Sequence, residues 1–79
     1  MMPDRIWVKL RLGFAELGAE WTKRAALSRI EGISTMELAA LRHQAKRERR
    51  KARLNANDRQ EWFYQTVIDA ADELLNSRP

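Results

Sequence analysis

The side chains with the clearest capacity for chemistry form one short run of basic residues. Between Arg42 and Arg53, seven Lys or Arg residues accompany a single acidic residue, Glu48. On one helix, with a rise of about 1.5 Å per residue, this run repels itself unless anions are close to it. A phosphate backbone relieves that repulsion with release of counterions, and Arg suits bidentate contacts with phosphate. The candidate residues for binding nucleic acid or an acidic partner are Arg42, Lys46, Arg47, Arg49, Arg50, Lys51 and Arg53.

A second interpretation assigns the same charges to contacts within the chain. Residues 54–79 hold five acidic residues and two basic ones, and a short turn would fold them antiparallel against the basic run. Arg50 and Arg53 would then lie near Asp58 and Glu61, and Arg42 would approach Asp69, Asp72 or Glu73. The sequence alone leaves both interpretations open.

The remaining polar residues do not suggest catalysis or a metal centre. His43 is the only histidine and the chain has no cysteine, so neither a metal-ligand spacing nor a disulfide can be assembled. The carboxylates of residues 69–73 share a polar face with no candidate nucleophile, and no glycine-rich phosphate loop occurs. We therefore expect a protein that is not an enzyme and that uses no cofactor.

Trp62 is a candidate for contact with another protein. It falls nearly opposite the apolar stripe of its predicted helix, among acidic residues, which predicts an exposed ring. Exposed tryptophan is typical of protein interfaces, and an acidic surround repels phosphate. In the alternative interpretation, the ring tucks under the N-terminal segment as additional core.

The elements that hold these residues are predicted to be two helices joined by a short turn. Ser34 and Glu37 form a potential capping box after Gly32, which predicts a helix over residues 34–54. A second helix is predicted over residues 58–76, with Asn57 or Asp58 as its N-cap. The turn at residues 55–57 makes the pair an antiparallel hairpin. The predicted inward positions are Leu38, Leu41, Ala45, Ala52, Phe63, Tyr64, Val67, Ile68, Ala71, Leu74 and Leu75, with Glu48 as a polar member.

The first third of the chain fits two templates. Five residues lie on one helical stripe, but residues 6–14 also alternate as in a half-buried strand. We favour a helix, kinked or broken at Gly13 or Gly18, because a single strand cannot satisfy its own hydrogen bonds. A partly extended segment over residues 5–14 remains the alternative. The helical stripe consists of Ile6, Leu10, Phe14, Leu17 and Trp21.

Residues 26–41 resemble a helix-turn-helix DNA-binding unit. The positions that match its spacing are Ser28, Gly32, Ile33, Leu38 and Leu41. Glu31 departs from the pattern, because the family usually has an apolar residue before the turn glycine. The resemblance implies that Ser34, Thr35 and Met36 face the major groove, with Arg42 and Lys46 on phosphates. With an extended N-terminal segment, the order of elements would instead resemble a ribbon-helix-helix repressor, with Lys9 and Arg11 in the groove.

These features predict a single all-α domain over residues 1–79, with three main helices and a hairpin of the last two. Its expected function is that of a regulator or accessory factor that binds nucleic acid or a nucleoprotein through the basic helix. The alternative is an adaptor or inhibitor that docks this helix on an acidic protein surface. A homodimer is expected, because so short a chain without disulfides has a marginal core.

The same composition argues against a membrane partner. No apolar run approaches the roughly 18 residues that span a bilayer. The start at Met1, Met2 and Pro3 lacks the cationic and then apolar order of a signal peptide. We therefore expect a cytoplasmic protein.

Overall fold

The computed structural model describes residues 4–78, in which four α-helices and no strand occur. The helices are α1 (Asp4–Leu17), α2 (Lys23–Ile30), α3 (Thr35–Leu54) and α4 (Asp58–Ser77), and the 3-10 turn η1 (Gly18–Glu20) follows α1. The all-α prediction is confirmed, whereas the extended alternative for residues 5–14 is wrong. The predicted count of three main helices is also corrected, to four in the described part of the chain. The N-terminal residues 1–3, used in the signal-peptide argument, lie outside it.

The break between α1 and α2 occurs at Gly18, one of the two glycines at which a break was predicted. Gly18 has a φ of +53°, in the left-handed region that glycine adopts without a steric penalty. The amide of Trp21 then donates to the Gly18 carbonyl at 3.1 Å, and the Thr22 hydroxyl accepts from the Ala25 amide to cap α2. The chain therefore turns back instead of continuing as one long helix, and Trp21 remains buried.

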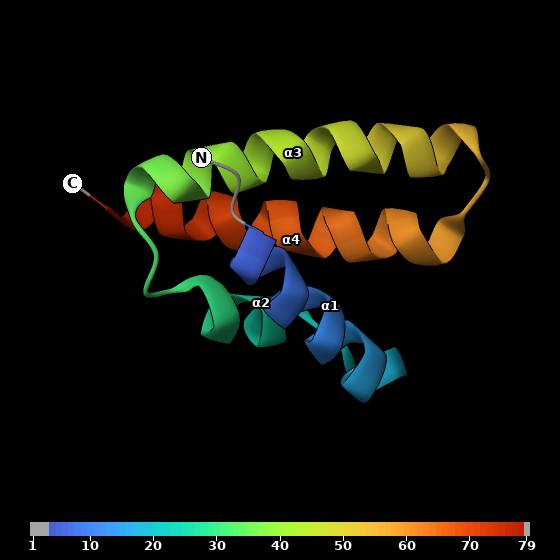
Figure 1. Cartoon of the computed structure of the whole chain (residues 1–79), viewed down its shortest axis with the longest axis horizontal. Coiled ribbons are helices and arrows are strands. Elements are labelled where there is room, and N and C mark those ends of the chain that lie inside the picture. Colours follow the sequence, from blue (N-terminus) through green and yellow to red (C-terminus); the bar gives the residue numbers. More distant parts are fainter. Residues whose placement is uncertain (1–3, 79) are drawn as a thin grey trace.

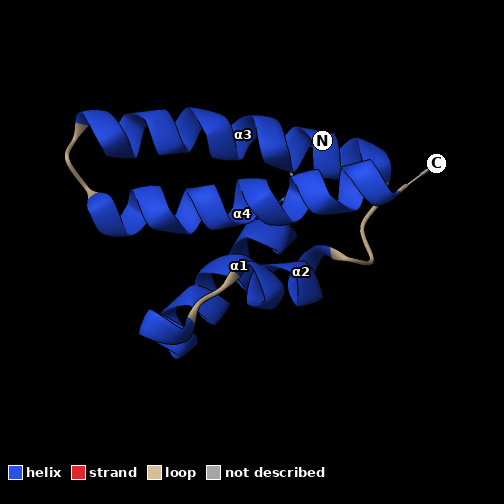
Figure 2. Ribbon diagram, turned by 180° about the vertical axis from the view of Figure 1, so that it is seen from behind, coloured by secondary structure: helices blue, strands red, loops and turns tan. Residues whose placement is uncertain are grey.

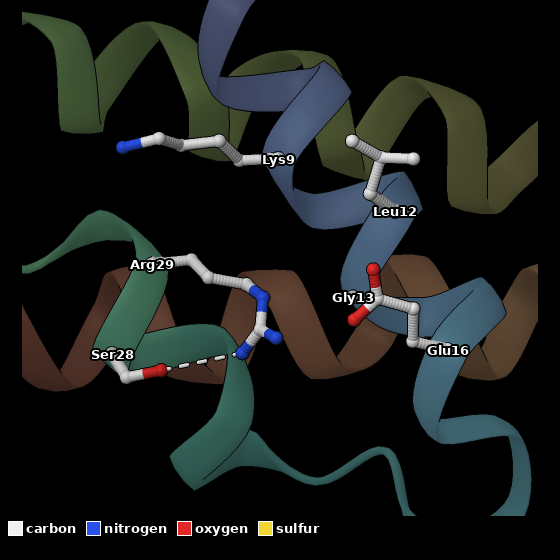
Figure 3. Close-up of a pocket in the computed structure, with 6 residues that line it drawn as sticks. All are labelled: Lys9, Leu12, Gly13, Glu16, Ser28 and Arg29. Atoms are coloured by element: carbon white, nitrogen blue, oxygen red, sulfur yellow. Dashed lines mark hydrogen bonds between the residues drawn. The ribbon is translucent and has the colours of Figure 1, made fainter.

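Gly13, the second of these glycines, lies within α1 and leaves the helix unbroken. Figure 3 shows it facing the Arg29 side chain of α2, and a Cβ at this position would lie 2.2 Å from Arg29 Nε. Arg29 Nη1 donates to the Ala25 carbonyl at 2.8 Å, and the guanidinium lies 5.8 Å from the centroid of the Trp21 ring. The missing side chain thus makes room for an arginine that packs between α1 and α2.

Helices α3 and α4 form the predicted antiparallel hairpin (Figure 1). Both predicted N-caps are present: the Ser34 hydroxyl accepts from the Glu37 amide at 3.1 Å, and Asn57 Oδ1 accepts from the Gln60 amide at 3.1 Å. The Glu37 carboxylate accepts from the Ser34 amide in return, which completes the capping box. Helix α4 ends at Ser77, one residue beyond the prediction.

The turn at residues 55–57 is a Schellman motif with alanine in its left-handed position. The Asn57 amide donates to the Ala52 carbonyl at 2.8 Å, and the Ala56 amide donates to the Arg53 carbonyl at 3.1 Å. Ala56 has a φ of +53°, a left-handed backbone conformation that is usually occupied by glycine. This turn satisfies the last carbonyls of α3 before α4 begins.

Helix α4 is the central element of the fold. Figures 1 and 2 show α3 along one side of it and the α1 and α2 pair on the other. The buried side chains meet around Phe63, whose ring lies 4.7 Å from Phe14 and 5.0 Å from Tyr64, centroid to centroid. Trp21 and Trp7 complete this aromatic cluster at 5.7 and 6.2 Å. Edge-to-face and tilted aromatic pairs at these separations add to the burial that stabilises a small domain.

Candidate functional site

Helix α3 presents the basic residues because its apolar positions are taken up by the core. Leu38, Leu41, Ala45 and Ala52 are buried, as predicted, and they form the seam that packs on α4. The residues between them are therefore distributed around the flanks and the outer side of the helix. The seven candidate residues therefore differ in whether they form hydrogen bonds or ion pairs within the chain.

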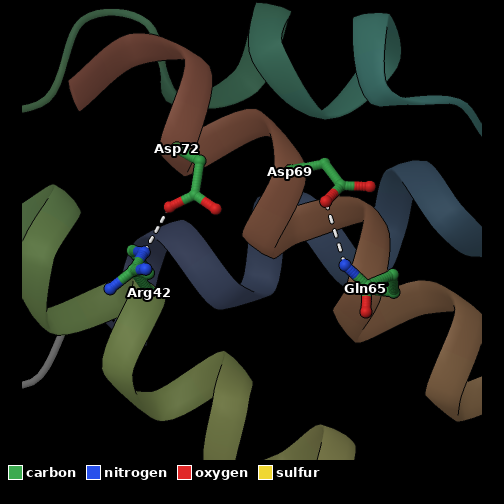
Figure 4. Close-up of polar contacts among 4 residues, drawn as sticks. All are labelled: Arg42, Gln65, Asp69 and Asp72. Carbon is green, nitrogen blue, oxygen red and sulfur yellow. Dashed lines mark hydrogen bonds and ion pairs between the residues drawn. The ribbon is translucent and has the colours of Figure 1, made fainter. Parts of the chain in front are cut away.

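Two arginines of the run form ion pairs with α4. Arg53 Nε donates to Glu61 Oε2 at 2.8 Å, and Arg42 Nε donates to Asp72 Oδ1 (Figure 4). Both pairs were expected from folding the acidic segment against the basic one, whereas Arg50, also expected near acidic residues of α4, forms no ion pair within residues 4–78. Each partner keeps part of its side chain in solvent, so the contribution of each pair to stability is modest, at about 0.2–1 kcal/mol.

Arg49 and Lys51 are also engaged, but with different partners. Arg49 Nη1 donates to the Gln65 side-chain oxygen. Gln65 Nε2 in turn donates to Asp69 Oδ1 at 2.9 Å, the hydrogen bond drawn in Figure 4. Lys51 Nζ lies 3.1 Å from the carboxylate of Glu48, one turn earlier on α3. Four of the seven basic side chains are therefore satisfied within the chain.

Lys46, Arg47 and Arg50 form the remaining group, which we call the basic face of α3. Within residues 4–78, none of the three takes part in a hydrogen bond or an ion pair. Arg47 and Arg50 are exposed and Lys46 is half-buried. Because residues three and four apart are neighbours on a helix, their side chains leave the same region of its surface. Three adjacent positive charges thus face solvent without a counter-charge.

The acidic residues of α4 contact cations on two different helices. Besides the contacts with α3, Glu73 Oε1 accepts from Lys23 Nζ of α2 at 2.8 Å. This hydrogen bond and the charge of Glu73 raise the pKa of Lys23 above its ordinary value. The carboxylates of α4 therefore pair with one cation of α2 and with two on one flank of α3. None of them forms an ion pair with the basic face.

A groove of about 860 Å³ lies between α1 and α3, next to the basic face. Arg47 and His43 of α3 line it together with Val8 and Arg11 of α1, while Trp7 and Gln44 contact each other within it. Sequence reasoning did not anticipate this groove, because it arises from the packing of α1 against α3. His43 is exposed, as predicted for a solvated helix residue.

The helix-turn-helix resemblance is not matched by the packing. Helix α2 packs on α4 and α1, while α3 lies along the other side of α4 (Figure 1). The Ser34 hydroxyl is used in the capping box, and Thr35 Oγ1 accepts from Arg78 Nη1 at 3.2 Å. The residues assigned to the major groove are therefore not presented as that family presents them, although Met36 is exposed. The ribbon-helix-helix alternative is wrong, because Lys9 and Arg11 lie on α1.

Trp62 is partly exposed and partly packed on the core, so each of the two interpretations of this residue holds in part. Its residue surface is 39% exposed, and one side of its ring packs edge-on against Phe14 with 5.5 Å between centroids. Arg59, one turn earlier on the chain, covers the Phe14 ring at 4.7 Å. The tryptophan is thus partly a surface residue and partly a support for the aromatic core.

The described residues contain no group of three or more His, Asp or Glu side chains placed to hold a metal ion. Among the helices of residues 4–78, none has the length and apolarity required to cross a bilayer. Comparison with protein-family models, curated proteins and solved structures finds no match to this chain.

Proposed function

We propose that this chain is a non-catalytic nucleic-acid-binding protein, a small regulator or accessory factor that holds phosphates on the basic face of α3. The observation that carries this proposal is the absence, within residues 4–78, of any anionic partner for Lys46, Arg47 and Arg50. An acidic helix packs directly beside α3, yet its carboxylates at Glu61, Asp72 and Glu73 pair with other cations. A cluster of this kind favours a polyanion from outside the chain.

The spacing of the basic face suits contact with a phosphate backbone. Side chains three or four residues apart on a helix have Cβ atoms about 5–6 Å apart, so long basic side chains can reach neighbouring phosphates of one strand. Arg42 and Arg53 flank these residues and retain partly exposed side chains despite their ion pairs. Because such contacts address the backbone and not base edges, we propose affinity with little sequence preference.

A salt titration tests the proposal. Fluorescence anisotropy with labelled duplex DNA, single-stranded DNA and RNA should show log K falling linearly with log salt. For duplex DNA the slope should be about −2.7, since each neutralised phosphate contributes about −0.9 and three cations are free. Replacing Lys46, Arg47 and Arg50 together by glutamine should remove most of this slope, and circular dichroism should show unchanged helix content.

A matched control distinguishes the effect of the basic face on binding from the effect of total charge. Lys9, Lys23 and Arg24 lie on α1 and α2, and replacing these three by glutamine removes the same charge. This control variant should keep a slope close to that of the native chain. Undetectable binding at low salt would exclude the proposal, as would equal losses in the two triple variants.

The groove between α1 and α3 favours a second candidate, an acidic protein surface as the partner. Trp7, Val8 and Ala40 give the groove apolar character, and Arg11 and Arg47 supply positive charge along it. A protein partner would combine apolar contact with charge pairing there. Capture of partners from lysate with and without nuclease distinguishes the two candidates, because only a nucleic-acid tether is lost on digestion.

A further inference from the structure

The outer face of α1 carries an apolar stripe that nothing in the described chain covers. Val8 and Leu12 are 56% and 57% exposed, and they lie one turn apart on the side of α1 away from its buried residues. Val8 is at the rim of the groove between α1 and α3 and keeps this exposure there. Figure 3 shows Leu12 and Glu16 on this helix, beside the Gly13 position against which Arg29 packs. Exposed apolar residues are usually scattered singly over a protein surface. An adjacent pair on one helix therefore suggests a binding surface.

Opposite charges lie at the two ends of this stripe. Arg5 is in the first turn of α1 and Glu16 in the last, and neither forms an ion pair within residues 4–78. At 3.6 residues per turn, the two side chains leave the helix within about 20° of one another. They therefore occupy the same flank of the Val8 and Leu12 stripe, too far apart along the axis to meet within one molecule.

We propose that this face binds a second copy of the chain, with the two α1 helices packed antiparallel. A twofold axis near Leu10 places Val8 of each copy against Leu12 of the other. A twofold axis also brings the same flank of both helices together, so Arg5 of each copy faces Glu16 of the other. One symmetric contact thus covers the apolar stripe and pairs both charges twice.

The charge pattern favours a second copy over other occupants. A uniformly acidic peptide or a phosphate backbone would meet Glu16 as a like charge, whereas antiparallel self-pairing neutralises both ends. Lys9 lies near the axis on the same flank, where it would meet its own counterpart and limit the affinity. Because one helix face is small against the roughly 1,200 Å² or more of a stable interface, the dimer should be weak.

Sedimentation equilibrium of the full chain, from about 10 μM to 1 mM, measures this association at the affinities expected of small interfaces. Arg5→Glu and Glu16→Arg each place like charges at both ends of the contact, so each should weaken dimerisation by about tenfold or more. Neither change should unfold α1, because Glu in a first turn and Arg in a last turn complement the helix dipole. Circular dichroism confirms that the variants remain helical.

Mixing the two single variants provides the decisive measurement. In a heterodimer of the Arg5→Glu and Glu16→Arg chains, both contacts again join opposite charges, so an equimolar mixture should associate with near-native strength. The double variant should likewise recover the native homodimer. A native chain that stays monomeric at 1 mM would overturn the proposal, and so would single variants that dimerise normally or a mixture that fails to associate. None of these readouts involves nucleic acid, so this test is independent of the proposed function.

Discussion

The indole Nε1 of Trp7 donates a hydrogen bond of 2.7 Å to the side-chain oxygen of Gln44, which joins the first half of α1 to the middle of α3. Trp7 is buried, and its ring also meets Tyr64 of α4 edge-on at 5.6 Å between centroids. One side chain therefore touches both helices of the hairpin. This contact holds α1 across the hairpin and defines the groove beside the basic face.

Replacing Gln44 by leucine should destabilise the fold by about 1–2 kcal/mol, because the indole N–H of Trp7 loses its acceptor in a buried setting. Urea denaturation of the native and variant chains measures this cost. In a Trp7→Phe background, which has no N–H to satisfy, the same Gln44→Leu change should cost clearly less. If Gln44→Leu cost the same free energy of unfolding in both backgrounds, the Trp7–Gln44 hydrogen bond would not be the cause of the lost stability.

Trp62→Ala should cost about 1–2 kcal/mol, more than an isolated surface residue would, because the ring packs against Phe14. Met36→Ala is the matched control, since that side chain is 83% exposed and should change the free energy of unfolding by less than about 0.5 kcal/mol. Chemical denaturation compares the two. A cost for Trp62→Ala no larger than the control would indicate that the ring contributes no packing.

Much of the hairpin could be predicted from sequence because its signals are local. The capping box of Ser34 and the asparagine cap of α4 depend on residues three positions apart, and both are present. Apolar spacing likewise predicted the buried apolar positions of α3 and five of the seven buried positions of α4. It missed Thr66 and Ala70, and the predicted Leu74 and Leu75 are only half-buried. The N-terminal third was harder, because α1 ends before Gly18 while the apolar stripe continues to Trp21 in the turn, so the periodic pattern runs past the end of the helix.

For the candidate site, the sequence predicted which basic residues cluster but not which of them are paired within the chain. Spacing identified the run from Arg42 to Arg53, but the choice between internal pairing and an external partner required tertiary contacts. The structure shows internal pairing for Arg42 and Arg53, which pair with α4, whereas Arg50 has no ion-pair partner among residues 4–78 and leaves the external partner a proposal. The groove beside Arg47 had no sequence signal, since residues far apart in the chain form its two walls.

Ala56→Gly should stabilise the chain by about 0.5–1 kcal/mol, because Ala56 adopts a left-handed conformation that glycine reaches without a Cβ clash. Thermal or urea denaturation would show the gain. Ala39→Gly, at an exposed position inside α3, is the control and should instead cost about 1 kcal/mol. A loss of stability in both variants would mean that the Ala56 backbone carries no penalty.

Glu61→Gln should strengthen nucleic-acid binding, because it releases Arg53 from its ion pair and adds a fourth free cation beside the basic face. The slope of log K against log salt should become steeper by about 0.9 for duplex DNA. Glu73→Gln raises the net charge by the same amount, but it frees Lys23 of α2 and leaves α3 unchanged, so the slope should stay as in the native chain. If both variants strengthened binding equally, total charge and not the arrangement on α3 would govern affinity, and the assignment of phosphates to this face would fail.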